Sequence, residues 1–111
     1  MQYEYFYGAQ AEQFSFYRIP KALFTEPNFR ELSTDAKVLY GILLDRMSLS
    51  LKNQWLDAQN KVYIIFTVEE IMDALNCANQ KATRLMVELE KQAGLIERKR
   101  QGLGRPNLIY V

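Results

Sequence analysis

Two short helical patterns separated by three residues constrain this sequence more than any other feature. The first begins at Thr67 and Glu70, which have the spacing of a capping box, and continues to about residue 75. The second runs from about Asn79 to Gln92 and places four apolar residues on one face: Ala82, Leu85, Met86 and Leu89. Two short helices joined by a three-residue turn predict a helix-turn-helix.

The residues after the second helix predict a β-hairpin. Gly94 suits the left-handed position that ends a helix, and residues 95–100 then alternate as a strand does. The run GLGRPN supplies turn residues before a second strand over residues 108–111. The expected fold is therefore α+β and mostly helical: a winged helix-turn-helix with a C-terminal β-hairpin wing and an N-terminal extended arm.

The residues before this motif predict two strands and a central helix. Residues 14–19 alternate apolar and polar side chains and predict a short strand, which a helical turn over residues 21–24 follows. A cap signal at residues 33–35 starts a helix that is apolar on most sides, so we expect it to be the most buried one. The apolar, β-branched residues 62–66 predict a buried strand.

The beginning of the chain differs from the rest and divides it into an arm, residues 1–13, and a winged-helix domain, residues 14–111. The arm carries four aromatic residues before a polar stretch: Tyr3, Tyr5, Phe6 and Tyr7. Two interpretations stay open. The arm is either a tail that folds back on its own core or a segment that packs on a second subunit.

The composition argues against catalysis. The sequence has no histidine, the side chain most used for proton transfer near neutral pH and for binding metals. Cys77 is the only cysteine, so the chain has no disulfide and no thiol pair for a metal. We expect no catalytic residue, no metal and no cofactor. No stretch approaches the roughly 18 consecutive apolar residues of a membrane span, so we expect a cytoplasmic protein without membrane contact.

The charge is unevenly divided along the chain. Residues 79–105 carry seven Lys and Arg residues and three Glu residues, a balance of +4, whereas the whole chain has a net charge of +1. The remaining residues therefore sum to −3. This segregation indicates a basic binding face on an acidic body, although charged segments are also often only solvated.

The outward face of the second helix predicts base contacts in a DNA major groove. Its residues are Gln80, Thr83, Arg84, Val87 and Lys91, with Lys81 at the margin. Gln80 can pair with adenine and Arg84 with guanine, and Thr83 or Val87 can touch a thymine methyl group. We expect Asn79 to cap the helix, where it could meet a phosphate. The alternative is an ordinary surface helix, which also shows polar residues opposite its core.

The hairpin predicts contacts with phosphates. Its candidate residues are Arg98, Lys99, Arg100, Gln101, Gly102, Gly104, Arg105 and Asn107. Four of them are cations beside a loop whose glycines let the backbone approach another surface. Strand alternation places Arg98 and Arg100 on one face and Lys99 on the other, and Arg105 could enter the minor groove. The alternative is a solubilising hairpin tip.

Four runs carry a resemblance to a known family: FYRIPKALF, ELSTDAKVLYGILLDRMSLS, KVYIIFTVEEIM and GLIERKRQGLGRPNLIYV. Through them, residues 16–111 resemble the N-terminal domain of the replication initiator A (RepA) family of low-GC Gram-positive, staphylococcal-type plasmids. The resemblance implies a homodimer that binds double-stranded DNA at repeated sites, or iterons, in a plasmid origin and initiates replication. It also implies host replication proteins as partners, bound through a C-terminal domain absent here.

Two other functions fit the same fold. A winged-helix transcriptional regulator would use the same chemistry at a promoter. A protein-interaction or oligomerisation module would use the fold without DNA, although the basic hairpin argues against it.

Overall fold

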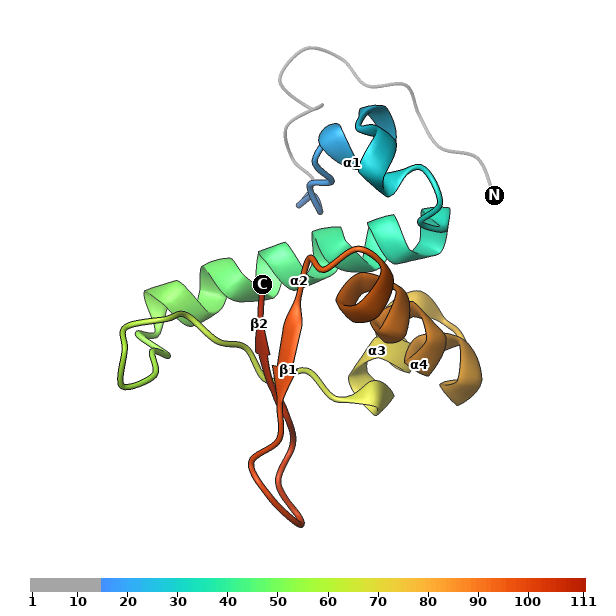
Figure 1. The fold of residues 1–111 in the computed structure, drawn as a ribbon. Coiled ribbons are helices and arrows are strands. Elements are labelled where there is room, and N and C mark those ends of the chain that lie inside the picture. The colour runs from blue at the N-terminus through green and yellow to red at the C-terminus, as the bar shows by residue number, and fades with distance from the viewer. Residues whose placement is uncertain (1–14) are drawn as a thin grey trace, which may run out of the picture.

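The computed structural model describes residues 15–111. In it, the helices lie above and to one side of a hairpin that projects from the body (Figure 1). The chain begins with α1 (Ala22–Thr25), a 3-10 turn η2 (Pro27–Phe29) and the long helix α2 (Thr34–Lys52). The predicted arm, with Tyr3, Tyr5, Phe6 and Tyr7, lies outside the described residues.

The predicted strand at residues 14–19 is wrong, because residues 15–20 have no regular secondary structure. This segment crosses α2 at Gly41. A Cβ atom at Gly41 would lie 2.9 Å from Cγ1 of Ile19 and 3.0 Å from the carbonyl oxygen of Arg18. The segment alternates apolar and polar residues because it packs across a helix. It is not a strand, because no neighbouring strand supplies the hydrogen bonds of a sheet.

The helix α2 begins as its sequence predicts. The Oγ atom of Ser33 accepts a hydrogen bond from the N–H of Ala36 at 3.1 Å, which satisfies one of the free amides of the first turn. Its buried positions include Ala36, Leu39 and Leu43, which are 0% exposed. The expectation of a central, buried helix is confirmed.

The helix-turn-helix consists of α3 (Val68–Leu75) and α4 (Asn79–Val87). Thr67 and Glu70 form the expected capping box at the start of α3, and Asn76 takes the left-handed conformation that ends it. The expected cap of α4 is wrong. Ala78 occupies that position without a side-chain hydrogen bond, and Asn79 is the first helical residue.

The last turn of the predicted 79–92 helix differs from a regular α-helix. It continues from α4 as a π-helical turn, η3 (Glu88–Gln92), in which the N–H of Ala93 donates to the carbonyl of Glu88. Gly94 follows with φ 65°, so the predicted glycine stop is confirmed.

The wing consists of β1 (Glu97–Lys99) and β2 (Leu108–Tyr110), paired antiparallel with Arg98 opposite Ile109. These strands are shorter than predicted. The predicted strand at 62–66 reduces to single-residue bridges, because within it only Ile64 lies opposite β2. Ile64 and Ile109 exchange two backbone hydrogen bonds of 2.9 Å, which join the wing to the body.

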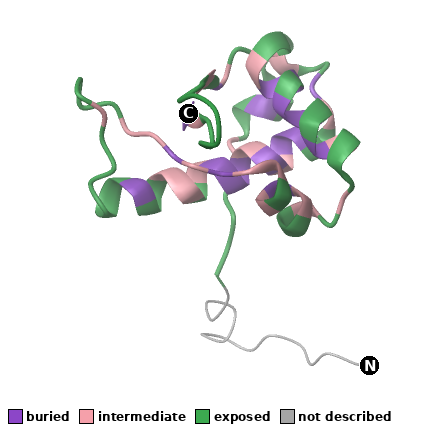
Figure 2. Cartoon of the chain, turned by 90° about the horizontal axis from the view of Figure 1, so that it is seen from below, coloured by how far each residue is buried: buried purple, intermediate pink, exposed green. Residues whose placement is uncertain are grey.

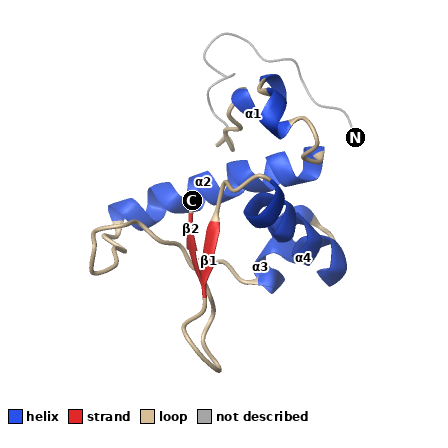
Figure 3. Ribbon diagram, viewed as in Figure 1, coloured by secondary structure: helices blue, strands red, loops and turns tan. Residues whose placement is uncertain are grey.

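The core lies where α2, the helix-turn-helix and the base of the wing meet, and Figure 2 shows the buried residues there. In Figure 3 the strands are confined to the hairpin and helices form most of the body, as expected for a winged helix-turn-helix. None of the helices within residues 15–111 is long and apolar enough to cross a membrane.

Candidate nucleic-acid interface

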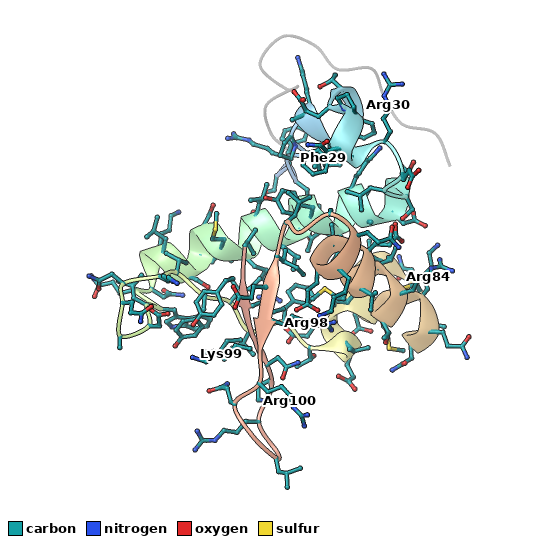
Figure 4. The ribbon with its side chains drawn as sticks, viewed as in Figure 1. Phe29, Arg30, Arg84, Arg98, Lys99 and Arg100 are labelled. Atoms are coloured by element: carbon teal, nitrogen blue, oxygen red, sulfur yellow. The ribbon has the colours of Figure 1, made fainter. Side chains whose placement is uncertain are left out.

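The buried side of α4 determines which of its residues face the solvent. Ala82 and Leu85 are 0% exposed and pack in the core. Four of the predicted base-contacting residues are exposed on this helix: Gln80, Thr83, Arg84 and Val87. Their positions lie three or four residues apart, so they share one face of the helix. Figure 4 shows Arg84 on the outer side of α4, away from α2.

Asn79 and Lys81 have partners within the protein. Oδ1 of Asn79 accepts a hydrogen bond from the hydroxyl of Thr83 at 3.4 Å. The ammonium of Lys81 lies 2.6 Å from a carboxylate oxygen of Asp35, in the first turn of α2. This ion pair links the start of α4 to the start of α2. Lys81 therefore has a paired charge, and Arg84 has no partner among the described carboxylates.

Arg98, the first cation of the wing, is held by Glu90. Its Nε and one terminal nitrogen donate to Oε1 of Glu90 at 3.0 and 2.8 Å, and its backbone N–H donates to Oε2 at 2.9 Å. The side chains are only 26% and 14% exposed. The side-chain hydrogen bond from Arg98 lowers the pKa of Glu90 most, against the opposing effect of burial. Arg98 therefore fastens the wing to η3, and its predicted phosphate contact stays a prediction.

The other wing cations are free of such contacts. Lys99, Arg100 and Arg105 are exposed, and none of the carboxylates in residues 15–111 forms an ion pair with them. In Figure 4, Arg98 lies on the side of the hairpin that faces α4, and Lys99 lies on the opposite side. Their separation follows from the alternation of side chains along a strand.

The tip of the wing is a closed turn. The N–H of Arg105 donates to the carbonyl of Gly102 at 3.3 Å, and the amide nitrogen of Gln101 donates across the loop to the carbonyl of Pro106 at 2.8 Å. Gly102 and Gly104 have φ values of 122° and 76°, which other residues rarely adopt. The predicted glycines are thus required by the turn itself.

A groove of about 280 Å³ lies between the base of the wing and the start of α3. The predicted wing residues Arg105 and Asn107 line it on one side, and Thr67 and Glu69 line it on the other. The wing and the helix-turn-helix therefore border a common concave surface. From α4, only the buried Met86 lines this groove, and the exposed residues Gln80 and Arg84 lie outside it.

Two glutamates of η3 are positioning residues that the sequence analysis missed. The carboxylate of Glu88 accepts hydrogen bonds from the N–H and the hydroxyl of Ser33, both at 2.9 Å, while Glu90 holds Arg98. Residues two apart on a helix point in different directions, so one turn can join α2 on one side and the wing on the other. Two glutamates two residues apart, shortly before a basic strand, are the sequence signal that could have indicated these two contacts.

The described residues hold no group of three or more His, Cys, Asp or Glu side chains that could bind a metal ion. Cys77 lies half-buried in the turn between α3 and α4 as a free thiol. The features that stand out on this surface are therefore exposed amides and cations, which suit hydrogen bonds to bases and charge contacts to phosphates.

Comparison with known proteins places these features in a family. The family model for the replication initiator protein A (RepA) N-terminus matches residues 15–111. A "41 kDa protein" of Lactobacillus helveticus is 32% identical over 92 residues, which are 83% of this chain and 26% of that protein. The chain thus spans about a quarter of the length of this relative.

Solved structures give the same result. One described as "N-Terminal domain of DNA binding protein" has a TM-score of 0.80 and 40% identity, over 99% of this chain and 83% of that one. "Structure of Rep-DNA complex" has the same TM-score and identity, over 97% and 82%. "Structure of MDR initiator" has a TM-score of 0.77 and 41% identity, over 97% and 84%.

Proposed function

The chain belongs to the family of replication initiator protein A N-terminal domains, and on that premise we propose that it binds repeated double-stranded sites in a plasmid replication origin to initiate replication. The observation that carries this proposal is the set of exposed cations without an ion-pair partner among the described carboxylates: Arg84 on the outward face of α4, and Lys99, Arg100 and Arg105 on the wing. A solved structure of 40% identity is described as a Rep-DNA complex, which supports the same function here.

The two walls have different roles in this proposal. The exposed face of α4 enters the major groove, where Gln80 and Arg84 contact base edges and Thr83 and Val87 contact thymine methyl groups. The helix start at Asn79 faces a phosphate.

The wing supplies the charge. Lys99, Arg100 and Arg105 contact phosphates, which contributes affinity with little sequence selection. Gln101 and Asn107 add neutral hydrogen bonds to the backbone of the DNA. Arg98 and Lys81 act mainly by holding the wing and α4 in place, because each is already paired with a carboxylate.

A homodimer completes the proposal, since repeated half-sites match identical subunits. An exposed apolar surface on the described residues supports a protein contact of this kind. It lies at the end of α2 and in the loop that follows: Leu49, Leu51, Trp55 and Leu56. Host replication proteins, bound through residues beyond this domain, and a cytoplasmic location belong to the same proposal, and we assign no catalytic step to the domain.

A transcriptional regulator would use the same walls and differ only in having its sites in a promoter. For the protein-interaction module, the supporting observation is the exposed apolar surface at the end of α2. That module would bind DNA weakly and with little dependence on salt.

The test is a titration of the purified chain against origin repeats and a scrambled duplex of equal length at several salt concentrations. We expect a strong preference for the repeats. Replacing Arg100 and Arg105 by alanine should weaken binding to both duplexes and reduce the slope of log K against log salt by about 2 units, roughly 0.9 for each phosphate that is no longer neutralised.

The matched control is Arg30→Ala. Arg30 is also exposed but lies at the opposite end of the molecule from the wing (Figure 4). We expect the slope of this variant to equal that of the wild type. Equal, weak binding of the wild type to both duplexes would instead favour the interaction module.

A further inference from the structure

The tip of the wing carries an apolar side chain that the fold does not use. Leu103 is 97% exposed, whereas the next most exposed large apolar residue in the described chain, Phe16, is 64% exposed. Burial of a leucine stabilises a protein by roughly 1.5 to 3 kcal/mol, and Leu103 contributes none of this to the monomer. Its whole side chain is therefore available to a partner outside the folded chain.

The turn at the tip does not require leucine. The hydrogen bond from Arg105 to Gly102 closes a four-residue turn with Leu103 second and Gly104 third. The φ value of 76° at Gly104 is that of the third residue of a type II turn, a position that favours glycine. The second position accepts most residues, and polar ones would be better solvated there. The turn thus presents Leu103 at its apex without depending on it.

The apex is also braced. The side chain of Gln101 bridges the loop to the carbonyl of Pro106 at 2.8 Å, so the two arms of the loop are joined just behind the tip. A braced loop loses less conformational freedom on binding than a slack one. Leu103 is therefore held as a projecting point, and the hairpin carries it away from the body (Figure 1).

The surroundings of the tip fit the walls of a DNA groove. Arg100 and Arg105 stand on either side of Leu103 in the sequence, both exposed and without an ion-pair partner in the described residues. The edges of the minor groove are lined by phosphates, and its floor offers base edges. The tip has a matching arrangement, with an apolar side chain that can face the base edges and a cation on each side that can face the phosphates. With α4 in the major groove, the wing falls on the adjacent minor groove.

We propose that Leu103 enters the minor groove beside the site read by α4 and wedges against one base step, partly unstacking it. Apolar side chains inserted in this way open base steps and bend DNA, at a cost that is lowest for flexible pyrimidine–purine steps. This inference rests on the proposed function. It gives the wing an action on the DNA in addition to its charge.

The experiment places 2-aminopurine, a base whose fluorescence rises when it is unstacked, at successive positions of an origin repeat. At saturating protein, the wild type should raise the fluorescence at one step in the groove beneath the wing. Leu103→Ala and Leu103→Ser should abolish the rise, and Leu103→Met should retain most of it. The affinity of the alanine variant should fall about tenfold, since that corresponds to roughly 1.4 kcal/mol of apolar burial against the DNA.

The controls separate the wedge from binding itself. Phe24→Ser changes another exposed apolar side chain, on α1, which takes no part in the proposed DNA or dimer contacts, and should leave the fluorescence unchanged. The melting temperatures of the Leu103 variants should equal that of the wild type, because the side chain packs on nothing. Preferential binding to the repeats with no fluorescence rise at any position, or a rise that persists in Leu103→Ala, would overturn the wedge. Loss of any preference for the repeats in the wild type would overturn the proposed function instead.

Discussion

The two walls of the candidate interface are packed on the core to different extents. The recognition helix α4 is fixed by burial, with Ala82 and Leu85 at 0% exposure and Met86 at 2%. The wing has three paired residues on each strand, and all of residues 99–107 are exposed. Hydrogen bonds to base edges need side chains placed within narrow tolerances, whereas phosphate contacts tolerate more variation. Apolar packing thus holds the wall that reads sequence along its length, whereas the wall that supplies charge is packed at its base, by Ile109, and clamped by Glu90.

The largest effect should come from removing packing beneath α4. Leu85→Ala leaves a cavity in the core, so we expect the free energy of unfolding to fall by about 2 to 5 kcal/mol, as measured by urea denaturation. Binding to cognate and random DNA should be lost together. The matched control is Val87→Ala on the same helix, where the side chain is 37% exposed and stability should change by roughly 0.5 kcal/mol or less. A Leu85→Ala variant with the stability of the wild type would show that α4 does not depend on apolar packing.

An intermediate effect should come from the exposed face of the same helix. Arg84→Ala should weaken binding to the cognate repeat by roughly 1 to 3 kcal/mol and leave binding to random DNA near normal, since it removes hydrogen bonds to a base. Arg100→Ala should weaken both alike. Fluorescence anisotropy with the two duplexes measures this difference. Equal losses on both duplexes for Arg84→Ala would remove its base-reading role.

The smallest effect should come from the clamp on the wing. Glu90→Gln replaces the charged acceptor of Arg98, so we expect a loss of about 1 kcal/mol in the free energy of unfolding. Arg98 lowers the pKa of Glu90 in the folded state below its ordinary value of 4.5. The stabilisation is therefore complete above about pH 5 and is lost as the pH falls through the lowered folded pKa.

Urea denaturation of the wild type and Glu90→Gln at a series of pH values checks this. The difference between them should be constant near neutral pH and should shrink in acid. Glu31→Gln, at an exposed glutamate on the loop before α2, is the matched control, and its free energy of unfolding near neutral pH should equal that of the wild type. A difference that grows as the pH falls would contradict the clamp.

Local signals allowed the helices to be predicted. Ser33 starts α2 through its own hydroxyl, Thr67 and Glu70 start α3 as a capping box, and Gly94 ends the helical run in the left-handed conformation. Each of these depends on residues within four positions of one another. The winged-helix order followed from them, and the predicted face of α4 is the exposed one.

The features that could not be predicted depend on contacts between distant segments. Residues 14–19 alternate like a strand, but a strand needs a partner, and the partner of this segment is the helix surface at Gly41. The ion pair between Arg98 and Glu90 could not be predicted, because strand alternation indicates only the face of the strand on which a side chain lies. It does not indicate which carboxylate packs against that face. The exposure of Leu103 could not be predicted either, because the glycines on both sides of it indicate a turn and not the direction of its side chain.

The hydrogen-bonded pair of Ile64 and Ile109 has a consequence for synthesis on the ribosome. Ile109 is 2% exposed in the core, and its partner precedes it by the whole helix-turn-helix. At roughly 5 to 20 residues per second, the chain needs about one to four seconds to extend from Leu89 to Ile109. For that interval the helices that form the apolar side of the core have been synthesised and β2, which covers it, has not, so the wing can join the body only after the rest of the core has been made.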